Sequence, residues 1–230
     1  MSNVNYLAQF AKSFNWAGFF LPKNVYQDCS KLYAFCRVLD DLVDEKTDLE
    51  LREERFNEIK NIYKKTYEID NNDRNILNQN EHELIVNDVI ELAYNNNIKR
   101  IILDDLIEGI GSDLKQKVYL RSVKDLLVYS YRVAGTVGLM MAKILSVSDT
   151  RSLKGAIDLG IAMQLTNIAR DVIEDKKMNR QYIKPDFENI EATLKLADMF
   201  YESSYTSIKK IPFKYRFAII AVSYTHLTLP

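Results

Sequence analysis

The chain of 230 residues is 47% hydrophobic, 27% charged and 11% aromatic, which excludes a disordered protein and suits one domain of good size. Its 7 Gly and 4 Pro together make up roughly 5% of the residues, whereas these two residue types make up about 12% of an average protein. Long helices are therefore favoured over sandwiches and barrels of many strands. With 31 basic and 32 acidic residues the net charge is −1, which gives no general attraction to nucleic acid. Any charge chemistry must come from local clusters.

Helical periodicity runs through most of the chain. An aromatic segment over 14–21 ends at Pro22, a residue that favours the first turn of a helix. Apolar residues recurring every three or four positions then predict helices over 23–45, 49–69, 83–94, 98–110, 122–145, 150–174 and 191–210, with loops over 70–80 and 179–185. The pattern predicts one all-α domain, a helical bundle of about eight helices.

The cysteines and histidines indicate no redox or zinc chemistry. Cys29 and Cys36 lie seven residues apart on one apolar stretch, as reduced core thiols do. His82 and His226 stand in unrelated polar contexts, which argues against a Ser-His-Asp triad and against a histidine-bound zinc. No apolar run approaches the roughly 18 residues of a membrane span, and no secretion signal is present. We expect a cytoplasmic protein and leave contact with a membrane surface open.

The first acidic cluster lies at the end of the predicted helix over 23–45. Here Arg37 precedes Asp40, Asp41, Asp44 and Glu45. Asp40 and Asp44 are four residues apart and project from the same helical face, where like charges repel. If the apolar neighbours draw the two carboxylates away from water, burying their charges costs much free energy. A hard divalent cation such as Mg²⁺, bound by both carboxylates, would remove that cost. A solvated acidic helix end is the alternative.

The second cluster lies near the end of the predicted helix over 150–174. Gln164, Asn167, Asp171 and Asp175 step by three, four and four residues and so share one face, which Arg170 flanks. The alternative is a surface helix with scattered polar residues. Two such pairs facing each other across a cavity could hold several Mg²⁺ ions and trap a diphosphate, which Arg37 and Arg170 would clamp.

The chemistry implied by this trap is metal-assisted departure of diphosphate. The carbocation left behind must be kept from water by apolar walls and aromatic faces. The candidates for these aromatic walls are Phe14, Tyr33, Phe35, Tyr129 and Tyr131. For each of them the alternative is an ordinary place in the hydrophobic core.

From about residue 10 to about residue 222, the sequence resembles the squalene/phytoene synthase family of head-to-head isoprenyl diphosphate synthases. It is most similar to the bacterial members that form phytoene. The blocks that carry the resemblance are K-S-F at 12–14 with L-P at 21–22, the first aspartate motif at 32–44, Y-x-V-A-G-x-V-G at 131–138 and the second aspartate motif at 164–175.

The resemblance implies an all-α isoprenoid synthase fold, a single helical bundle around a central cavity. It implies condensation of two geranylgeranyl diphosphates, through a cyclopropylcarbinyl diphosphate, to phytoene in carotenoid biosynthesis. The cofactor implied is Mg²⁺, with Mn²⁺ as a substitute. By position, the metal ligands would be Asp40, Asp44, Asn167, Asp171 and Asp175.

The resemblance also implies the residues that bind substrate. Ser13 and Tyr33 would contact the diphosphate, and Arg37, Gln164, Asn167 and Arg170 would support it and the metals. Phe14 would also bind substrate, and Tyr131 and Tyr182 would line the pocket near the reacting carbons. Tyr131 would be catalytic together with the four aspartates. Gly135, within the small residues at 134–138, would let the isoprenoid lie close to the backbone; tight helix packing or a kink is the alternative.

The sequence departs from the family in two places. The family's R-x-Y-[LI]-P stretch is Arg180-Gln181-Tyr182-Ile183-Lys184-Pro185 here, with the proline displaced by one position. Residues 223–230 resemble no part of the family. We therefore expect an isoprenoid synthase domain over 1–222 that is incomplete at its C-terminus, followed by a non-native tail over 223–230.

Three other readings stay open. Squalene, dehydrosqualene or presqualene diphosphate synthases use farnesyl diphosphate, and the squalene-type reaction adds NADPH. A terpene cyclase shares a similar fold but is disfavoured by the two aspartate motifs with Y-x-V-A-G-x-V-G. A non-catalytic assembly factor would tend to lose the aspartates, which this chain retains. The pattern predicts neither substrate chain length nor oligomeric state.

Overall fold

A computed structural model describes residues 21–69 and 80–208 of the chain. Ser13, Phe14 and the tail at 223–230 lie outside the described residues. Within them the elements are α3 (Lys23–Asp44), α4 (Leu49–Glu68), α5 (Glu81–Asn95), α6 (Arg100–Gly111), β1 (Val118–Tyr119), α7 (Val123–Ser130), the π-helical turn η2 (Tyr131–Gly135), α8 (Thr136–Ile144), α9 (Thr150–Arg170), α10 (Val172–Lys177), β2 (Arg180–Gln181) and α11 (Phe187–Ile208). The predicted all-α class is confirmed.

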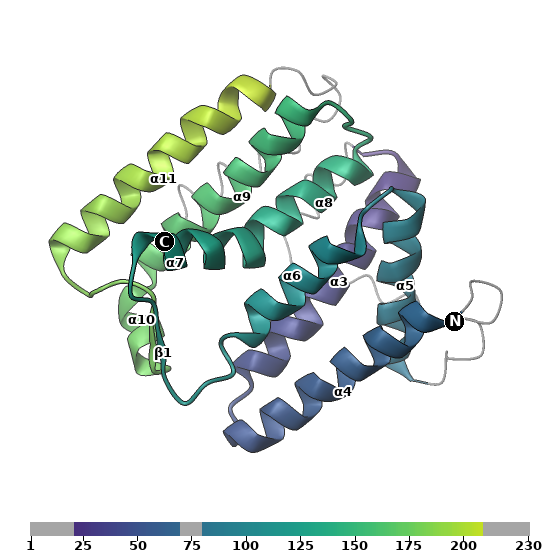
Figure 1. Ribbon diagram of the computed structural model, residues 1–230, viewed down its shortest axis with the longest axis horizontal. Coiled ribbons are helices and arrows are strands. Elements are labelled where there is room, and N and C mark those ends of the chain that lie inside the picture. The colour runs from purple at the N-terminus through teal and green to yellow at the C-terminus, as the bar shows by residue number, and fades with distance from the viewer. Residues whose placement is uncertain (1–20, 70–79, 209–230) are drawn as a thin grey trace.

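The helices form two groups that meet at α8 (Figure 1). On one side α11 packs on α9, and α9 packs on α8; on the other side α3, α4 and α5 pack together. Apolar side chains of α3 to α6 and α8 form the larger core cluster. A smaller cluster joins α7, α9 and α11 to Val118 of β1 and to Tyr182, which directly follows β2.

The first four described helices end within about two residues of the predicted bounds, a normal uncertainty for helix ends. The side chain of Asn80 caps α5 by accepting a hydrogen bond from the Glu83 amide at 2.9 Å. Ser122 caps α7 in the same way through the Asp125 amide at 3.1 Å. These caps place the helix starts where polar residues precede an apolar periodic run.

Four predicted elements differ from the structure. The segment over 122–145 is interrupted by η2, and the helix over 150–174 bends at Asp171, where α9 gives way to α10. The loop over 179–185 contains β2, which pairs in parallel with β1 so that Val118 lies opposite Arg180. Helix α11 begins at Phe187, four residues before the predicted start, because Asp186 accepts the Asn189 amide at 2.8 Å. Local capping and long-range pairing, which periodicity does not register, explain these last two differences.

Glycines allow the close crossing of α8 and α9. A Cβ on Gly138 would clash with the backbone carbonyl of Ala156, and one on Gly160 would clash with the carbonyl of Ala134. At Gly135 the nearest neighbours of a Cβ would instead be the side chains of Tyr131, Ile157 and Ile161, at 3.1 to 3.3 Å. Tight helix packing therefore accounts for Gly138 and Gly160, whereas contact of Gly135 with substrate stays a prediction.

Candidate active site

The first aspartate pair lies on the last turns of α3. Leu39, Leu42 and Val43 are buried in the larger core cluster, and this orientation leaves Asp40 and Asp44 on the water-exposed side of the same turns. Arg37 lies one turn earlier and pairs with Asp41 in a two-pronged contact, with Nε 3.0 Å from Oδ2 and Nη2 2.7 Å from Oδ1. One predicted phosphate-binding arginine is therefore held beside the pair.

The second aspartate pair lies at the bend between α9 and α10. The helical hydrogen bonding continues through the bend, because the Asp171 amide donates to Asn167 and the Asp175 amide donates to Asp171. Arg170 pairs with Asp171 through two hydrogen bonds of 2.7 and 2.6 Å. The second predicted phosphate-binding arginine is thus also held beside its aspartates.

Arg180 connects the two motifs. Its side chain is only 9% exposed, and its Nη1 lies 2.7 Å from Asp44 Oδ1. Its Nη2 also donates to the Val43 carbonyl at 3.3 Å, near the C-terminal end of α3, where a positive charge is favourable. Because Arg180 belongs to β2, which follows α10 directly, this contact fastens the segment after the second aspartate pair to the first pair.

A buried polar cluster lies next to Arg180. Tyr129 and Tyr182 stack with their ring centroids 4.7 Å apart, and the Tyr129 hydroxyl donates to Asp113 Oδ2 at 2.7 Å. The two hydroxyls are 3.0 Å apart. Burial raises the pKa of Asp113, although the hydrogen bond from Tyr129 and the charge of Arg180 oppose the rise. Tyr182, predicted to line the pocket, is therefore buried in this cluster.

The charges of the two aspartate pairs act on each other. Burial among the surrounding protein, followed by the charge of Asp44, raises the pKa of Asp40 to about 7. Asp40 as a whole residue is nevertheless exposed to water. Burial and then the charge of Asp171 raise the pKa of Asp175 to about 6, and Asp113 and Asp44 add to that rise. The charge of Asp44 therefore acts on Asp175, in keeping with the contact between Arg180 and Asp44 that links the two motifs.

The other predicted site residues lie around this region. Tyr131 opens the π-helical turn η2, a feature often found at functional sites, and its hydroxyl donates to Asp105 Oδ2 at 3.3 Å. Burial and then the charge of Asp105 raise the pKa of Tyr131. Tyr33 on α3 and Gln164 on α9 are half-buried. Their substrate contacts and an enclosed cavity between the pairs stay predictions.

The donor chemistry suits a hard divalent cation. In the described parts of the chain, no three Asp, Glu, His or Cys side chains are already gathered tightly enough to hold a metal ion. Asp40, Asp44, Asp171 and Asp175 nevertheless supply four carboxylates on the two segments that Arg180 links, and Oδ1 of Asn167 is buried without a hydrogen-bond partner among the residues described. Carboxylate and amide oxygens are the ligands that Mg²⁺ accepts. The residues present therefore fit the metal that the resemblance implies.

Sequence reasoning missed Asp113 and the link formed by Arg180. Arg180 stands in the R-x-Y stretch, but only the pairing of β2 with β1 turns its side chain towards Asp44. Asp113 is a single acidic residue just after α6, without a patterned partner in the sequence. No local signal could have placed it beside Tyr129 and Tyr182.

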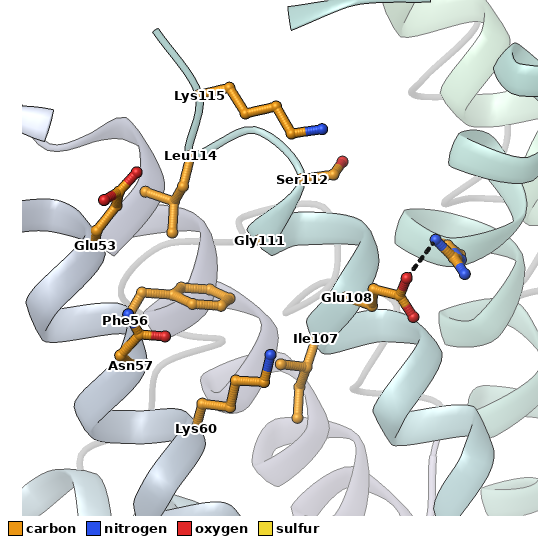
Figure 2. Close-up of a pocket in the computed structure, with 11 residues that line it drawn as sticks. Glu53, Phe56, Asn57, Lys60, Ile107, Glu108, Gly111, Ser112, Leu114 and Lys115 are labelled. Atoms are coloured by element: carbon orange, nitrogen blue, oxygen red, sulfur yellow. Dashed lines mark ion pairs between the residues drawn. The ribbon is translucent and has the colours of Figure 1, made fainter.

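A separate open pocket of about 430 Å³ lies between α4 and the end of α6 (Figure 2). Phe56 and Ile107 form its apolar part, and Lys60 extends towards it from α4. At one edge Glu108 pairs with Arg132 at 3.0 Å. None of the predicted site residues lines this pocket, so it is distinct from the acidic site.

Comparison with known proteins identifies the family. Residues 7–187 match the family model described as squalene/phytoene synthase. The 15-cis-phytoene synthases of a Paracoccus species and of Pantoea ananas are 34% and 33% identical to this chain, over 81% and 78% of it. These alignments cover 60% and 58% of the two enzymes. The chain therefore spans about three fifths of the length of these relatives.

Solved structures agree on the fold. A crystal structure of a dehydrosqualene synthase in complex with ligand matches with a TM-score of 0.70 and 27% identity, covering 96% of this chain and 80% of that one. Squalene synthase HpnC from Alicyclobacillus acidocaldarius matches with a TM-score of 0.68, and at 16% identity it bears on the fold alone. The isoprenoid synthase fold is thereby confirmed. Taken with the two aspartate motifs and the family match over residues 7–187, this likeness establishes that the chain belongs to the squalene/phytoene synthase family.

Proposed function

We propose that this chain belongs to a Mg²⁺-dependent prenyltransferase that condenses two geranylgeranyl diphosphates head to head into phytoene. The observation that carries the proposal is the ion pair of Arg180, which follows the second aspartate pair in the chain, with Asp44 of the first pair. The influence of the charge of Asp44 on Asp175 supports it. The similarity to two 15-cis-phytoene synthases supports the choice of product.

The four aspartates and the amide oxygen of Asn167 would hold the metal. When bound, Mg²⁺ supplies the positive charge that lets a diphosphate rest between acidic groups and leave. Arg37 and Arg170 would donate hydrogen bonds to the phosphate oxygens with their planar guanidinium groups. Tyr131 and the apolar side chains of η2 and α9 would keep water from the allylic cation.

The proposed reaction has two stages. One substrate loses its diphosphate, and the double bond of the other attacks C1 of the resulting allylic cation. Loss of a proton then closes the three-membered ring of a cyclopropylcarbinyl diphosphate. Loss of the second diphosphate, rearrangement and loss of a proton then give phytoene. This route consumes no reductant, whereas the squalene branch ends in hydride transfer from NADPH.

A second candidate is a dehydrosqualene- or squalene-type synthase that uses farnesyl diphosphate. The observation that favours it is the likeness to the dehydrosqualene synthase structure, which covers 96% of this chain. Incubation with geranylgeranyl or farnesyl diphosphate and Mg²⁺, with and without NADPH, separates the two candidates. Phytoene from the longer substrate supports the first candidate, and a C30 hydrocarbon from the shorter one supports the second.

The catalytic assignment is tested by Asp40→Asn and Asp171→Asn. Each removes one charge from a different pair, and we expect Mg²⁺-dependent diphosphate release to fall by about 100-fold or more, the scale seen when one group that stabilises transition-state charge is lost. Asp198→Asn, on the exposed side of α11, is the matched control and should retain activity. Turnover that survives both site substitutions would show that the aspartates do not carry the reaction.

A further inference from the structure

The last turn of α3 carries an unfavourable distribution of charge. Asp41 and Asp44 stand in this turn and Glu45 directly follows it, whereas the turn contains no basic residue. The last carbonyl groups of a helix have no partner within the helix and carry a partial negative charge, so cations stabilise this end and carboxylates destabilise it. The turn that presents Asp44 would therefore tend to unwind unless groups from other elements hold it.

Arg52, on the first turn of α4, is one such group. Helix α4 follows α3 after residues 45–48 and packs against it. The Nη1 of Arg52 donates a hydrogen bond to the Val43 carbonyl at 2.8 Å, and the Nη2 of Arg180 donates to the same carbonyl at 3.3 Å. A carbonyl oxygen has two lone pairs and can accept both. Two guanidinium groups, one from α4 and one from β2, thus converge on one backbone group in the last turn of α3.

The two arginines hold different parts of this turn. Arg180 contacts the carboxylate of Asp44 as well as the Val43 carbonyl, whereas the hydrogen bond of Arg52 goes to the backbone. Asp44 is the last residue of α3, and the backbone turns to an extended conformation at Glu45. The direction of the Asp44 carboxylate therefore depends on whether the backbone before it stays helical.

The surroundings of Arg52 indicate that stability alone does not explain an arginine at this position. Its residue is half-buried, and its Nε is buried without a hydrogen-bond partner among the residues that the structure describes. An unsatisfied buried donor lowers stability. Local rules of this kind are broken mainly at functional sites. Arg55, one turn further along α4, instead contacts the side chain of Glu45 at 2.6 Å, outside the helix that presents Asp44.

We propose that Arg52 is a positioning residue of the candidate active site. Its hydrogen bond keeps the last turn of α3 helical, so that Asp44 stays in the orientation in which Arg180 holds it and in which it would bind the metal. The inference rests on the proposed function, because it takes Asp44 as a ligand of Mg²⁺. Removing a group that orients a metal ligand commonly weakens metal binding by about 10- to 100-fold.

Calorimetric titration of the full chain with inorganic diphosphate in the presence of Mg²⁺ tests the inference without relying on turnover. We expect Arg52→Met to bind about 10-fold or more weakly than the parent chain. Arg52→Lys keeps a cation on a long side chain and should recover most of the affinity, although its ammonium lacks the planar fork of a guanidinium. If Arg52→Met does not fold, Arg52→Gln takes its place with the same expectation.

The matched control is Arg151→Met, which removes an exposed arginine at the start of α9, the opposite end of that helix from Asp171. It should bind like the parent chain. Hydrogen–deuterium exchange separates a positioning role from a general loss of stability. In Arg52→Met the amides of Val43 and Asp44 should exchange faster, while those in the middle of α9 should exchange as in the parent chain.

The outcomes distinguish this inference from the proposed function. Equal binding by Arg52→Met and the parent chain would overturn the inference alone. Equal losses in Arg52→Met and Arg151→Met, or faster exchange throughout the chain in Arg52→Met, would also overturn it. If the parent chain itself does not bind diphosphate in the presence of Mg²⁺, the proposed function fails, and the inference fails with it.

Discussion

At the residue scale, Arg180 makes two contacts at the end of α3. Its guanidinium holds Asp44 and the Val43 carbonyl from a nearly buried position. The Val43 carbonyl also accepts a hydrogen bond from Arg52 Nη1 at 2.8 Å, so Asp44 is the acceptor that depends more on Arg180. Since buried donors are costly to remove when their acceptors stay behind, the contact ties local stability to the geometry of the first aspartate pair.

We predict that Arg180→Met lowers the free energy of unfolding by about 2 kcal/mol, because it removes a nearly buried charge-assisted hydrogen bond to Asp44 and the positive charge beside the buried carboxyl of Asp113. Urea unfolding followed by circular dichroism measures the change. Arg121→Met is the matched control, because Arg121 is exposed, and surface substitutions of this kind usually stay within about 0.5 kcal/mol. Equal stability of the two variants would show that the link to Asp44 contributes nothing.

The raised pKa values of Asp40, about 7, and Asp175, about 6, predict a pH dependence of stability. Both exceed the ordinary value of 3.8, so the folded state holds these protons more tightly than the unfolded chain does. The stability they contribute is complete below about pH 4 and is lost as the pH rises through 6 to 7. Without metal, Asp40→Asn should therefore melt at a higher temperature than the parent chain at about pH 8, with a smaller difference at about pH 5.

Thermal melts of the two proteins at several pH values check this expectation. Added Mg²⁺ should reverse the order at about pH 8, because the metal requires the carboxylate that the variant lacks. Asp198→Asn serves again as the control and should show no such crossing. A constant difference in melting temperature across the pH range would contradict the raised pKa of Asp40.

At the element scale, the crossing of α8 and α9 sets the position of the π-helical turn η2. We predict that Gly138→Ala lowers the free energy of unfolding by about 1 to 3 kcal/mol, since the new methyl group would press on the Ala156 carbonyl. Replacing a glycine inside a helix by alanine ordinarily stabilises it by about 0.5 to 1 kcal/mol, so the sign of the change is diagnostic.

Gly135→Ala separates packing from substrate contact. Its new methyl group would meet only side chains, which can move by a few tenths of an ångström, so we expect a smaller loss of stability than at Gly138. If Gly135 lies against the isoprenoid, activity should fall more than stability does. Denaturant unfolding and product formation, measured on both variants, distinguish the two effects.

The helices themselves were predictable from the sequence, but their interruptions were not. Apolar periodicity located α3 to α6 well because each presents one continuous face to the core. The bend at Asp171 keeps the same three- and four-residue spacing of polar side chains, so periodicity extends through it unchanged. The inserted residue of η2 likewise leaves an apolar sequence on both sides.

At the scale of the whole molecule, the two aspartate motifs were predictable as chemistry and not as geometry. Their composition and spacing indicated diphosphate and metal before any coordinates. The contact that brings them together joins residues 136 positions apart, Asp44 and Arg180, and no pattern within either motif specifies it. No pattern in the sequence specifies the position of Asp113 and Tyr182 either. Both of them contact the hydroxyl of Tyr129 on α7.

The short parallel pairing of β1 with β2 has a consequence for how assembly of the site can be followed. Arg180 reaches Asp44 only while its strand is in register, so the amide protons of Val118 and Leu120 report on that register. Hydrogen–deuterium exchange at these two amides should slow when inorganic diphosphate and Mg²⁺ are added, and it should quicken in Arg180→Met. Two backbone protons thus report whether the two aspartate motifs are joined through Arg180.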